Sequence, residues 1–196
     1  LERARAQEEY TVEKCILKVY PEGYVFISIL AKIMGDFYSV NISLVGEPHQ
    51  DYPLFIVDEH EEPLAYEFRD GAVEVFTLYS HSINISYVTT SITSKEKEVW
   101  TIEVKLPADS EIILPEGALI VELSTIPLLI DVKGEAPVLV MPKGDIKVSY
   151  IIPPPITPPP PPPPTNQTQP TQQGEQPTQT TTQNQTETET ETSEEV

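Results

Sequence analysis

The sequence is poor in the residue types on which binding to nucleic acids and membranes depends. Its 196 residues include 12 Lys+Arg against 31 Asp+Glu, which gives a formal net charge of −19. Nucleic acids and anionic lipid surfaces attract clusters of Lys and Arg, so we expect neither as a partner. No apolar run approaches the roughly 20 residues of a membrane helix. We therefore expect any contact with a membrane to require a segment outside this chain.

Glycine, histidine and cysteine are also scarce. The eight glycines form no phosphate-binding loop, and His49, His60 and His81 lack the spacing of metal ligands. Cys15 is the single cysteine, which excludes an intrachain disulfide. Because it shares strand parity with apolar Leu17, we predict a buried small hydrophobe rather than a reactive thiol. The sequence predicts no catalytic residue and no cofactor.

Proline, threonine and glutamine are abundant, and they divide the chain in two. Residues 153–196 hold 12 of the 21 prolines and contain almost no large aliphatic residues, so they cannot bury a core. We predict a flexible N-terminal segment at 1–9, a folded domain at 10–152, a polyproline II stalk at 153–164 and a disordered Thr/Gln/Glu-rich spacer at 165–196. The stalk would span roughly 35 to 40 Å at about 3.1 Å per residue.

The folded domain has the pattern of an all-β protein. Short β-branched and aromatic runs are separated by Pro, Gly and Asp, with little of the spacing that a helix requires. The clearest unit is a hairpin of strands 10–20 and 24–33 around Pro21, Glu22 and Gly23. About a dozen short strands favour an antiparallel, immunoglobulin-like β-sandwich. We interpret it as one domain, with a division near 91–98 as the alternative.

All four asparagines, Asn41, Asn84, Asn166 and Asn184, begin an N-x-[S/T] acceptor for N-glycosylation. Chance would place all four in such triplets about once in a thousand sequences of this composition. The alternative is a composition depleted of thermolabile asparagine, as in thermophiles.

Strand alternation adds an independent indication for two of these acceptors. A glycan acceptor must face solvent, and side chains of a strand alternate between its two faces. Around Asn41 and Asn84 the apolar residues share the opposite face. The residues predicted to point inward are Tyr38, Val40, Ile42, Leu44, Ile83, Ile85 and Tyr87.

Stalk, spacer and acceptors together predict an extracellular location. A folded head on a proline rod and a hydroxyl-rich spacer is typical of a domain held away from a membrane or wall. We expect secretion, display at the cell surface and an anchor beyond Val196. A proline rod also suits an SH3-like groove, but that requires a cytoplasmic setting, against which the acceptors argue.

The densest acidic cluster lies at 58–62. Asp58, Glu59, Glu61 and Glu62 are weak candidates for a hard cation, which prefers carboxylate oxygens. The segment also lies between two apolar runs, where a hairpin needs a polar turn ending at Pro63. We favour the turn.

Several turn and strand-face patterns resemble a known family. They are residues 18–24, 86–95, 99–107, 113–118 and 148–150. Together they resemble the extracytoplasmic β-domain of archaeal membrane or cell-surface proteins, a family without an assigned activity. The resemblance covers roughly residues 10–152 and implies an extracytoplasmic all-β domain. Such relatives often continue into a membrane helix and sometimes into a cytoplasmic DNA-binding module.

These observations favour a non-catalytic, glycosylated cell-surface domain on a proline-rich stalk, acting in binding, sensing or envelope shielding. Its partners would be envelope or S-layer components, or other copies of itself. One alternative is a subunit of an extracellular filament or surface assembly, joined by β-strand addition through an edge such as 8–15. Another is an extracellular carbohydrate-active enzyme, because many acidic residues offer many carboxylate pairs.

Overall fold

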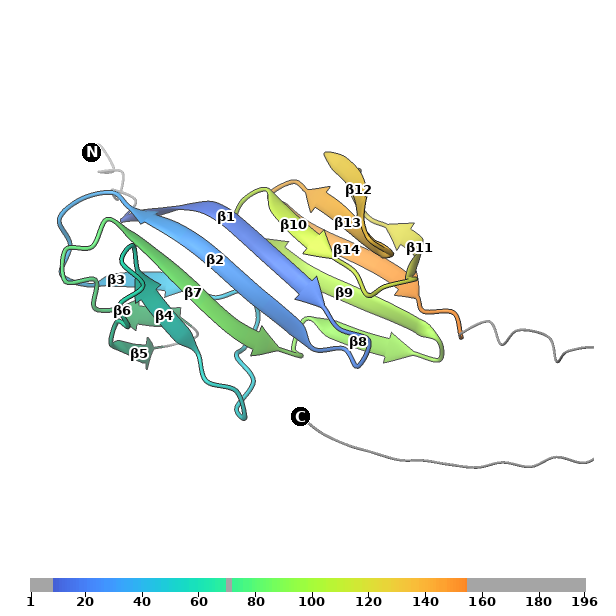
Figure 1. Ribbon diagram of the computed structural model, residues 1–196, viewed down its shortest axis with the longest axis horizontal. Coiled ribbons are helices and arrows are strands. Elements are labelled where there is room, and N and C mark those ends of the chain that lie inside the picture. Colours follow the sequence, from blue (N-terminus) through green and yellow to red (C-terminus); the bar gives the residue numbers. More distant parts are fainter. Residues whose placement is uncertain (1–8, 70–71, 155–196) are drawn as a thin grey trace, which may run out of the picture. The chain divides into compact units, whose positions relative to one another are not determined.

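The computed structural model describes residues 9–69 and 72–154, and within these ranges it contains fourteen strands and no helix. The strands form one seven-stranded sheet and two smaller sheets (Figure 1). The predicted all-β sandwich is therefore confirmed. Among the described residues there is no helix long and apolar enough to cross a membrane. The predicted N-terminal segment before residue 9, and the stalk and spacer from residue 155 onward, lie outside the described residues.

The seven-stranded sheet has the order β12-β13-β10-β1-β2-β7-β4. Its strands are β1 (Tyr10–Val19), β2 (Val25–Ile33), β4 (Phe55–Asp58), β7 (Ser82–Thr89), β10 (Ser110–Ile113), β12 (Leu129–Lys133) and β13 (Ala136–Met141). The four-stranded sheet, in the order β11-β14-β9-β8, consists of β8 (Thr93–Glu96), β9 (Val99–Leu106), β11 (Leu119–Leu123) and β14 (Gly144–Ile151). The three-stranded sheet, β3-β6-β5, consists of β3 (Val40–Ser43), β5 (Tyr66–Arg69) and β6 (Ala72–Val75).

The two smaller sheets lie behind opposite ends of the long strands (Figure 1). Alternate residues of β1, β2 and β7 are fully buried, among them Leu17, Ile27 and Ile85. These side chains belong to one hydrophobic cluster with Val73 of the three-stranded sheet and Ile102 of the four-stranded sheet. One continuous core therefore holds all three sheets together.

One strand pairing departs from the predicted antiparallel arrangement. β1 and β10 run parallel, with Cys15 beside Ser110 and Lys18 beside Ile113. The chain leaves the seven-stranded sheet after β7, forms β8 and β9 in the second layer, and re-enters the first at β10. Parallel neighbours require such a long crossover connection, whereas the hairpins of this fold require only short turns.

The segment 8–15, predicted as an exposed edge, does not belong to an outer strand. β1 lies between β2 and β10, and the outer strands of its sheet are β12 and β4. β10 pairs with the second half of β1, from Cys15 to Lys18. Among the described residues, residues 10–14 of β1 therefore have a strand partner only in β2, so strand addition at this segment stays a prediction.

Strand alternation correctly placed the asparagines of the folded domain. Asn41 in β3 and Asn84 in β7 are exposed, while their apolar neighbours along each strand are buried. The prediction for Tyr38 was wrong, because β3 begins only at Val40 and Tyr38 is 56% exposed. Alternation holds only where the backbone is extended, so a residue before the strand is free to point outward.

The alternative domain boundary at 91–98 falls inside one compact unit that includes all the described residues. Within it, β8 pairs with β9 from Thr93 beside Ile102 to Glu96 beside Val99. The Thr93 hydroxyl also donates to the Gly23 carbonyl at 2.7 Å, which ties this hairpin to the first one. The segment is therefore part of the sandwich rather than a linker.

The first hairpin has the predicted turn, and the structure shows a second reason for its glycine. The Gly23 N–H donates to the Tyr20 carbonyl at 2.9 Å, and Gly23 has a φ of 90°, a conformation that side chains disfavour. A Cβ at this position would also lie 2.5 Å from the ring of Trp100 in β9. The turn of one layer thus presses against an aromatic ring of the other.

We predict that Gly23→Ala lowers the free energy of unfolding by about 2 kcal/mol or more, because it adds both backbone strain and overlap with Trp100. Gly117→Ala is the matched control, since Gly117 has a φ of 71° and no heavy atom within 4 Å of where its Cβ would lie. It should lose only about 1 kcal/mol, from strain alone. Denaturant unfolding measures both variants, and equal losses would contradict the role assigned to Trp100.

Candidate functional site

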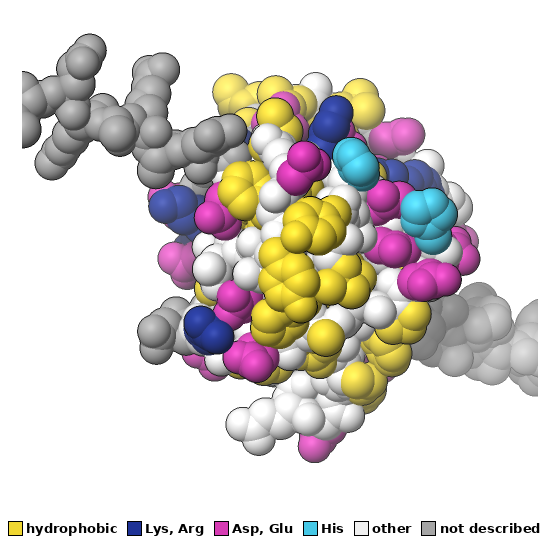
Figure 2. Space-filling view, turned by 90° about the vertical axis from the view of Figure 1, so that its left-hand side faces the viewer, with side chains coloured by type: hydrophobic (Ala, Val, Ile, Leu, Met, Phe, Trp, Pro, Cys, Tyr) yellow, Lys and Arg dark blue, Asp and Glu magenta, His cyan; other side chains and the backbone are white. Residues whose placement is uncertain are grey.

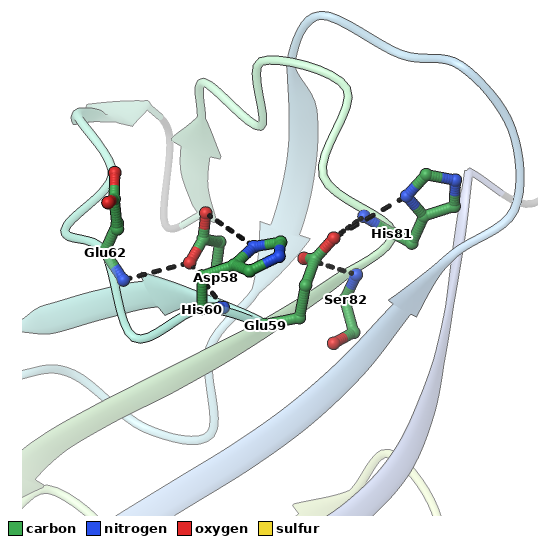
Figure 3. Close-up of polar contacts among 6 residues, drawn as sticks. All are labelled: Asp58, Glu59, His60, Glu62, His81 and Ser82. Carbon is green, nitrogen blue, oxygen red and sulfur yellow. Dashed lines mark hydrogen bonds and ion pairs between the residues drawn. The ribbon is translucent and has the colours of Figure 1, made fainter.

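The predicted acidic loop follows β4, and its first carboxylate organises the turn. Asp58 Oδ1 accepts hydrogen bonds from the backbone N–H of His60 at 2.8 Å and of Glu62 at 2.9 Å (Figure 3). Its other oxygen lies 3.8 Å from His60 Nδ1. The loop closes back on β4 through the Leu64 N–H, which donates to the Ile56 carbonyl at 2.9 Å. The segment therefore has the geometry of a tight polar turn.

Glu59 reaches from this loop to the start of β7. Its two carboxylate oxygens accept from the backbone N–H groups of His81 at 3.2 Å and Ser82 at 3.3 Å, and His81 Nδ1 lies 3.6 Å away (Figure 3). Its own backbone N–H, followed by that of His81, lowers the pKa of Glu59 to about 2. The carboxylate therefore stays ionised and braces the segment that precedes β7.

These contacts bear on the cation candidates. Ligand atoms of Asp58, Glu59 and His60 all lie within 4.8 Å of one another. However, the carboxylates of Asp58 and Glu59 already accept backbone N–H donors. The Glu62 side chain points away from both (Figure 3). These hydrogen bonds stabilise the loop itself. Glu61 lies in its turn, with a positive φ of 65°.

The segment that Glu59 braces, residues 77–82, has an unusual backbone. Leu78 and Tyr79 have φ values of 49° and 71°, and the Ser80 N–H closes the turn on the Thr77 carbonyl at 2.9 Å. Two successive positive φ values define the turn that normally contains Asn-Gly. Bulky side chains in this conformation each cost roughly 1 to 2 kcal/mol.

The other side of this turn is fastened to the loop before β3. The Thr77 hydroxyl donates to the Phe37 carbonyl, and the Leu78 N–H donates to the Tyr38 carbonyl at 3.3 Å. With Glu59 on the opposite side, the strained turn is held from two directions. The fold therefore fixes the backbone from which the side chains of Leu78 and Tyr79 project.

Three aromatic side chains and one leucine lie at this turn and beside it, and we call them the aromatic surface: Tyr38, Phe76, Leu78 and Tyr79. The Tyr38 ring packs edge to face on Phe76 and on Tyr79, with centroid separations of 6.1 and 6.3 Å. Tyr79 is 59% exposed. Figure 2 shows hydrophobic side chains gathered in the middle of this end of the molecule, beside histidines and acidic groups.

Polar groups of the three-stranded sheet border the aromatic surface. Glu74 accepts a hydrogen bond from the Ser39 hydroxyl at 3.0 Å and lies 2.8 Å from Arg69. Asn41 lies opposite Glu74 in the strand register, on the face of the sheet that also carries Phe76. Apolar rings and a charged, hydrogen-bonding rim therefore lie side by side.

Hollows also occur elsewhere among the described residues. A cleft of about 750 Å³ lies between the first residues of β1, the segment 43–45 and the segment 105–109. Its carboxylate Asp109 accepts from the Lys143 N–H at 3.0 Å, so it stabilises a turn. A groove of about 450 Å³ lies beside Tyr52 and Phe68. There His49 Nδ1 accepts from the Asp51 N–H at 3.3 Å.

Of the four glycosylation candidates, the structure describes two. Asn41 lies in β3 and Asn84 in β7, and both are exposed. Asn166 and Asn184 lie outside the described residues. The aromatic surface itself was missed, because Tyr38 was assigned to a strand and no turn motif marks Leu78 and Tyr79. The available signal was the pair of bulky side chains Leu78 and Tyr79 directly before Ser80.

Comparison with known proteins identifies no family for this chain. No family model matches it, and no curated protein matches it. A crystal structure of an M1 zinc metallopeptidase from Deinococcus radiodurans is similar over 74% of this chain and 42% of its own, with 10% identity and a TM-score of 0.45. A crystal structure of a two-domain M1 zinc metallopeptidase mutant bound to L-tryptophan is similar over 74% of this chain and 43% of its own, with 9% identity and a TM-score of 0.45. The chain spans less than half the length of these structures.

We predict that the Glu59 carboxyl titrates near pH 2 and stabilises the fold in its ionised form. Its pKa is lowered from 4.5 in the folded state, so this stabilisation is present above pH 4.5 and is lost as the pH falls toward 2. Carboxyl chemical shifts measured by NMR give the midpoint. Denaturation against pH should show Glu59→Gln less stable than the unchanged protein at pH 7, with the difference shrinking toward pH 2. Glu61→Gln in the same loop serves as the control, and a Glu59 midpoint at or above 4.5 would contradict the bracing.

Proposed function

We propose that this protein is a non-catalytic binding domain displayed at a cell surface, and that its aromatic surface binds carbohydrate of the cell envelope. The observation that carries the proposal is the turn at Leu78 and Tyr79, where two bulky side chains adopt left-handed conformations and are exposed. This strain weakens the fold, and burial of the two side chains does little to offset it. We infer that the turn persists because it presents Tyr79 beside Tyr38.

The chemistry of the aromatic surface suits a sugar. Aromatic rings offer apolar faces against which the C–H groups of a sugar ring pack, and a tyrosine hydroxyl supplies a polar end. Ser39, Glu74 and Arg69 supply hydrogen-bond donors and acceptors for sugar hydroxyls at the border of the rings. The rings lie on an exposed face rather than inside a cavity, which favours a shallow site for one segment of a polymer.

Display at a cell surface rests on the sequence. The proline-rich segment and the Thr/Gln-rich spacer are typical of stalks, and the four N-x-[S/T] acceptors are typical of exported proteins. An envelope polysaccharide is then the carbohydrate that such a domain would encounter. The aromatic surface and the location therefore support the same ligand class.

We predict that Tyr79→Gly removes carbohydrate binding without weakening the fold. Loss of one stacking ring should raise the dissociation constant at least about tenfold. Glycine accepts the left-handed conformation, so the free energy of unfolding should stay constant or rise by up to about 1 kcal/mol. Affinity electrophoresis in gels containing soluble polysaccharides measures binding, and denaturant unfolding measures stability.

Tyr52→Ala is the control for this experiment. It removes another exposed ring, which lies in a different aromatic group with Tyr24 and His49, and it should leave binding unchanged. Equal binding by Tyr79→Gly and the unchanged protein would count against the aromatic surface. Release of reducing ends from a bound polysaccharide would show catalysis and would contradict a purely binding role.

We further propose that Asn41 and Asn84 carry N-glycans in the native host. Asn84 is exposed, and its Oδ1, rather than the amide nitrogen to which a glycan is attached, accepts from the Ser28 hydroxyl at 3.2 Å. Asn41 lies on the face of β3 that points away from the core. A glycan at Asn41 would border the aromatic surface.

Intact mass spectrometry of natively purified protein should therefore show glycan mass at both positions. Asn41→Gln and Asn84→Gln should each remove the mass of one glycan, because the acceptor amide is lost. Both substitutions are at exposed positions, so the variants should fold normally. Unmodified peptides at both sites would rule the proposal out.

A further inference from the structure

The sandwich is open along one side. β12 is an outer strand of the seven-stranded sheet, and β11 is an outer strand of the four-stranded sheet. Residues 124–128 join these two strands, so both sheets end on the same side of the domain (Figure 1). Every residue of β12 is exposed. We call this side, formed by β11, β12 and their connection, the open edge.

β12 carries a row of side chains that has the character of a core. Ile130 and Val132 share one face of the strand, and Leu128 directly precedes β12 in the connection. Ile130 lies beside Leu139 of β13, which is fully buried, so this face turns toward the core. Yet the three side chains are 58%, 59% and 60% exposed. An apolar row that faces the core but remains in water favours a partner that covers it.

β4, the other outer strand of the seven-stranded sheet, is protected. The free side of β4 is covered by the segment that follows it, since Val57 bridges Pro63 and the Leu64 N–H donates to the Ile56 carbonyl at 2.9 Å. Among the described residues no strand or bridge covers the free side of β12, so β12 is the less protected outer strand of this sheet.

The backbone of β12 also presents groups to a further strand. The Pro137 carbonyl accepts from the Leu114 N–H, so Pro137 faces β10. Its partner Val132 therefore directs its N–H and C=O away from β13, and Ile130 does the same by alternation. Asp131 Oδ1 accepts the Val132 N–H at 2.8 Å. The N–H and C=O of Ile130 thus point toward the open edge.

We propose that the open edge docks a second copy of this chain, with the two β12 strands antiparallel and a two-fold axis at Ile130. In this register Ile130 exchanges two backbone hydrogen bonds with the same residue of the other copy. Asp131 lies opposite Leu129, so the two Asp131 carboxylates do not face each other. The register is self-complementary, as a two-fold interface requires.

The size and charge of the open edge suit a copy of the chain. Its exposed apolar side chains present on the order of 600 Å², near the roughly 800 Å² that each partner buries in a standard interface. The two charges of β12 balance, and Lys133 is paired with Glu111 at 2.6 Å. The apolar residues at this edge are Leu119, Val121, Ile126, Leu128, Leu129, Ile130 and Val132.

The net charge of the whole chain then determines how the contact depends on salt. Two copies that each carry a charge of −19 repel each other at long range. Salt screens this repulsion, so pairing through an apolar edge should strengthen as the ionic strength rises. A complex held by a basic partner would weaken under the same change.

Sedimentation equilibrium of the full chain tests the proposal. We expect a reversible dimer whose association constant rises between about 0.02 M and about 0.5 M salt. Ile130→Lys places two like charges at the two-fold axis and should weaken the dimer by about 100-fold or more. Phe55→Lys is the matched control, because Phe55 is 62% exposed on the outer strand β4 and should leave the constant unchanged.

Disulfide trapping tests the register. Residues directly opposite each other in a hydrogen-bonded antiparallel pair have Cα atoms about 5.5 Å apart, which suits a disulfide. Under mild oxidation, Ile130→Cys should therefore cross-link two copies, and Phe55→Cys should not. The native Cys15 is buried and does not compete.

A monomer at every concentration and salt, or a dimer unaffected by Ile130→Lys, would overturn the proposal. Equal cross-linking of the cysteine variants at 130 and 55 would overturn it too. The test is independent of carbohydrate binding, because Ile130 is not part of the aromatic surface. Ile130→Lys should retain one polysaccharide site per chain.

Discussion

Burial of one face of the seven-stranded sheet is the interaction on which the rest of the structure depends. The inward residues of β1, β2 and β7, such as Leu17, Ile27 and Ile85, are fully buried against two smaller sheets. Side chains of this size each contribute roughly 1.5 to 3 kcal/mol by leaving water. The second layer is split, so its two sheets cover different parts of the same face. Side chains of the seven-stranded sheet that these two sheets do not cover, such as those of β12, remain exposed.

A core of this size allows the domain to tolerate local strain at its surface. The turn at Leu78 and Tyr79 is held by Glu59 on one side and by the loop at Tyr38 on the other. Backbone strain persists only where the surrounding contacts determine the conformation. The acidic loop, which resembles a cation site in sequence, acts in the structure as one of those contacts. The Glu59 carboxylate holds the segment before β7, which carries the exposed Tyr79.

The two proposals, carbohydrate binding at the aromatic surface and self-association at the open edge, are related. A shallow surface of exposed rings binds one sugar segment weakly, because little area is buried and few groups are ordered. A dimer joined at β12 would carry two such surfaces on one rigid scaffold. Binding the second surface to the same polymer is then an intramolecular step, which raises the overall affinity. Self-association would thus support binding to a repetitive envelope polymer.

The sequence by itself determined the all-β class, the first hairpin with Gly23, the burial of Cys15 and the outward direction of Asn84. Each of these depends on local backbone geometry, which a two-residue period or a turn residue reports directly. Only the tertiary structure decided that β1 and β10 are parallel, that β12 is the open edge and that Glu59 braces the segment before β7. Strand order and side-chain partners arise from contacts between residues far apart in the chain, and alternation along one strand carries no record of its neighbours.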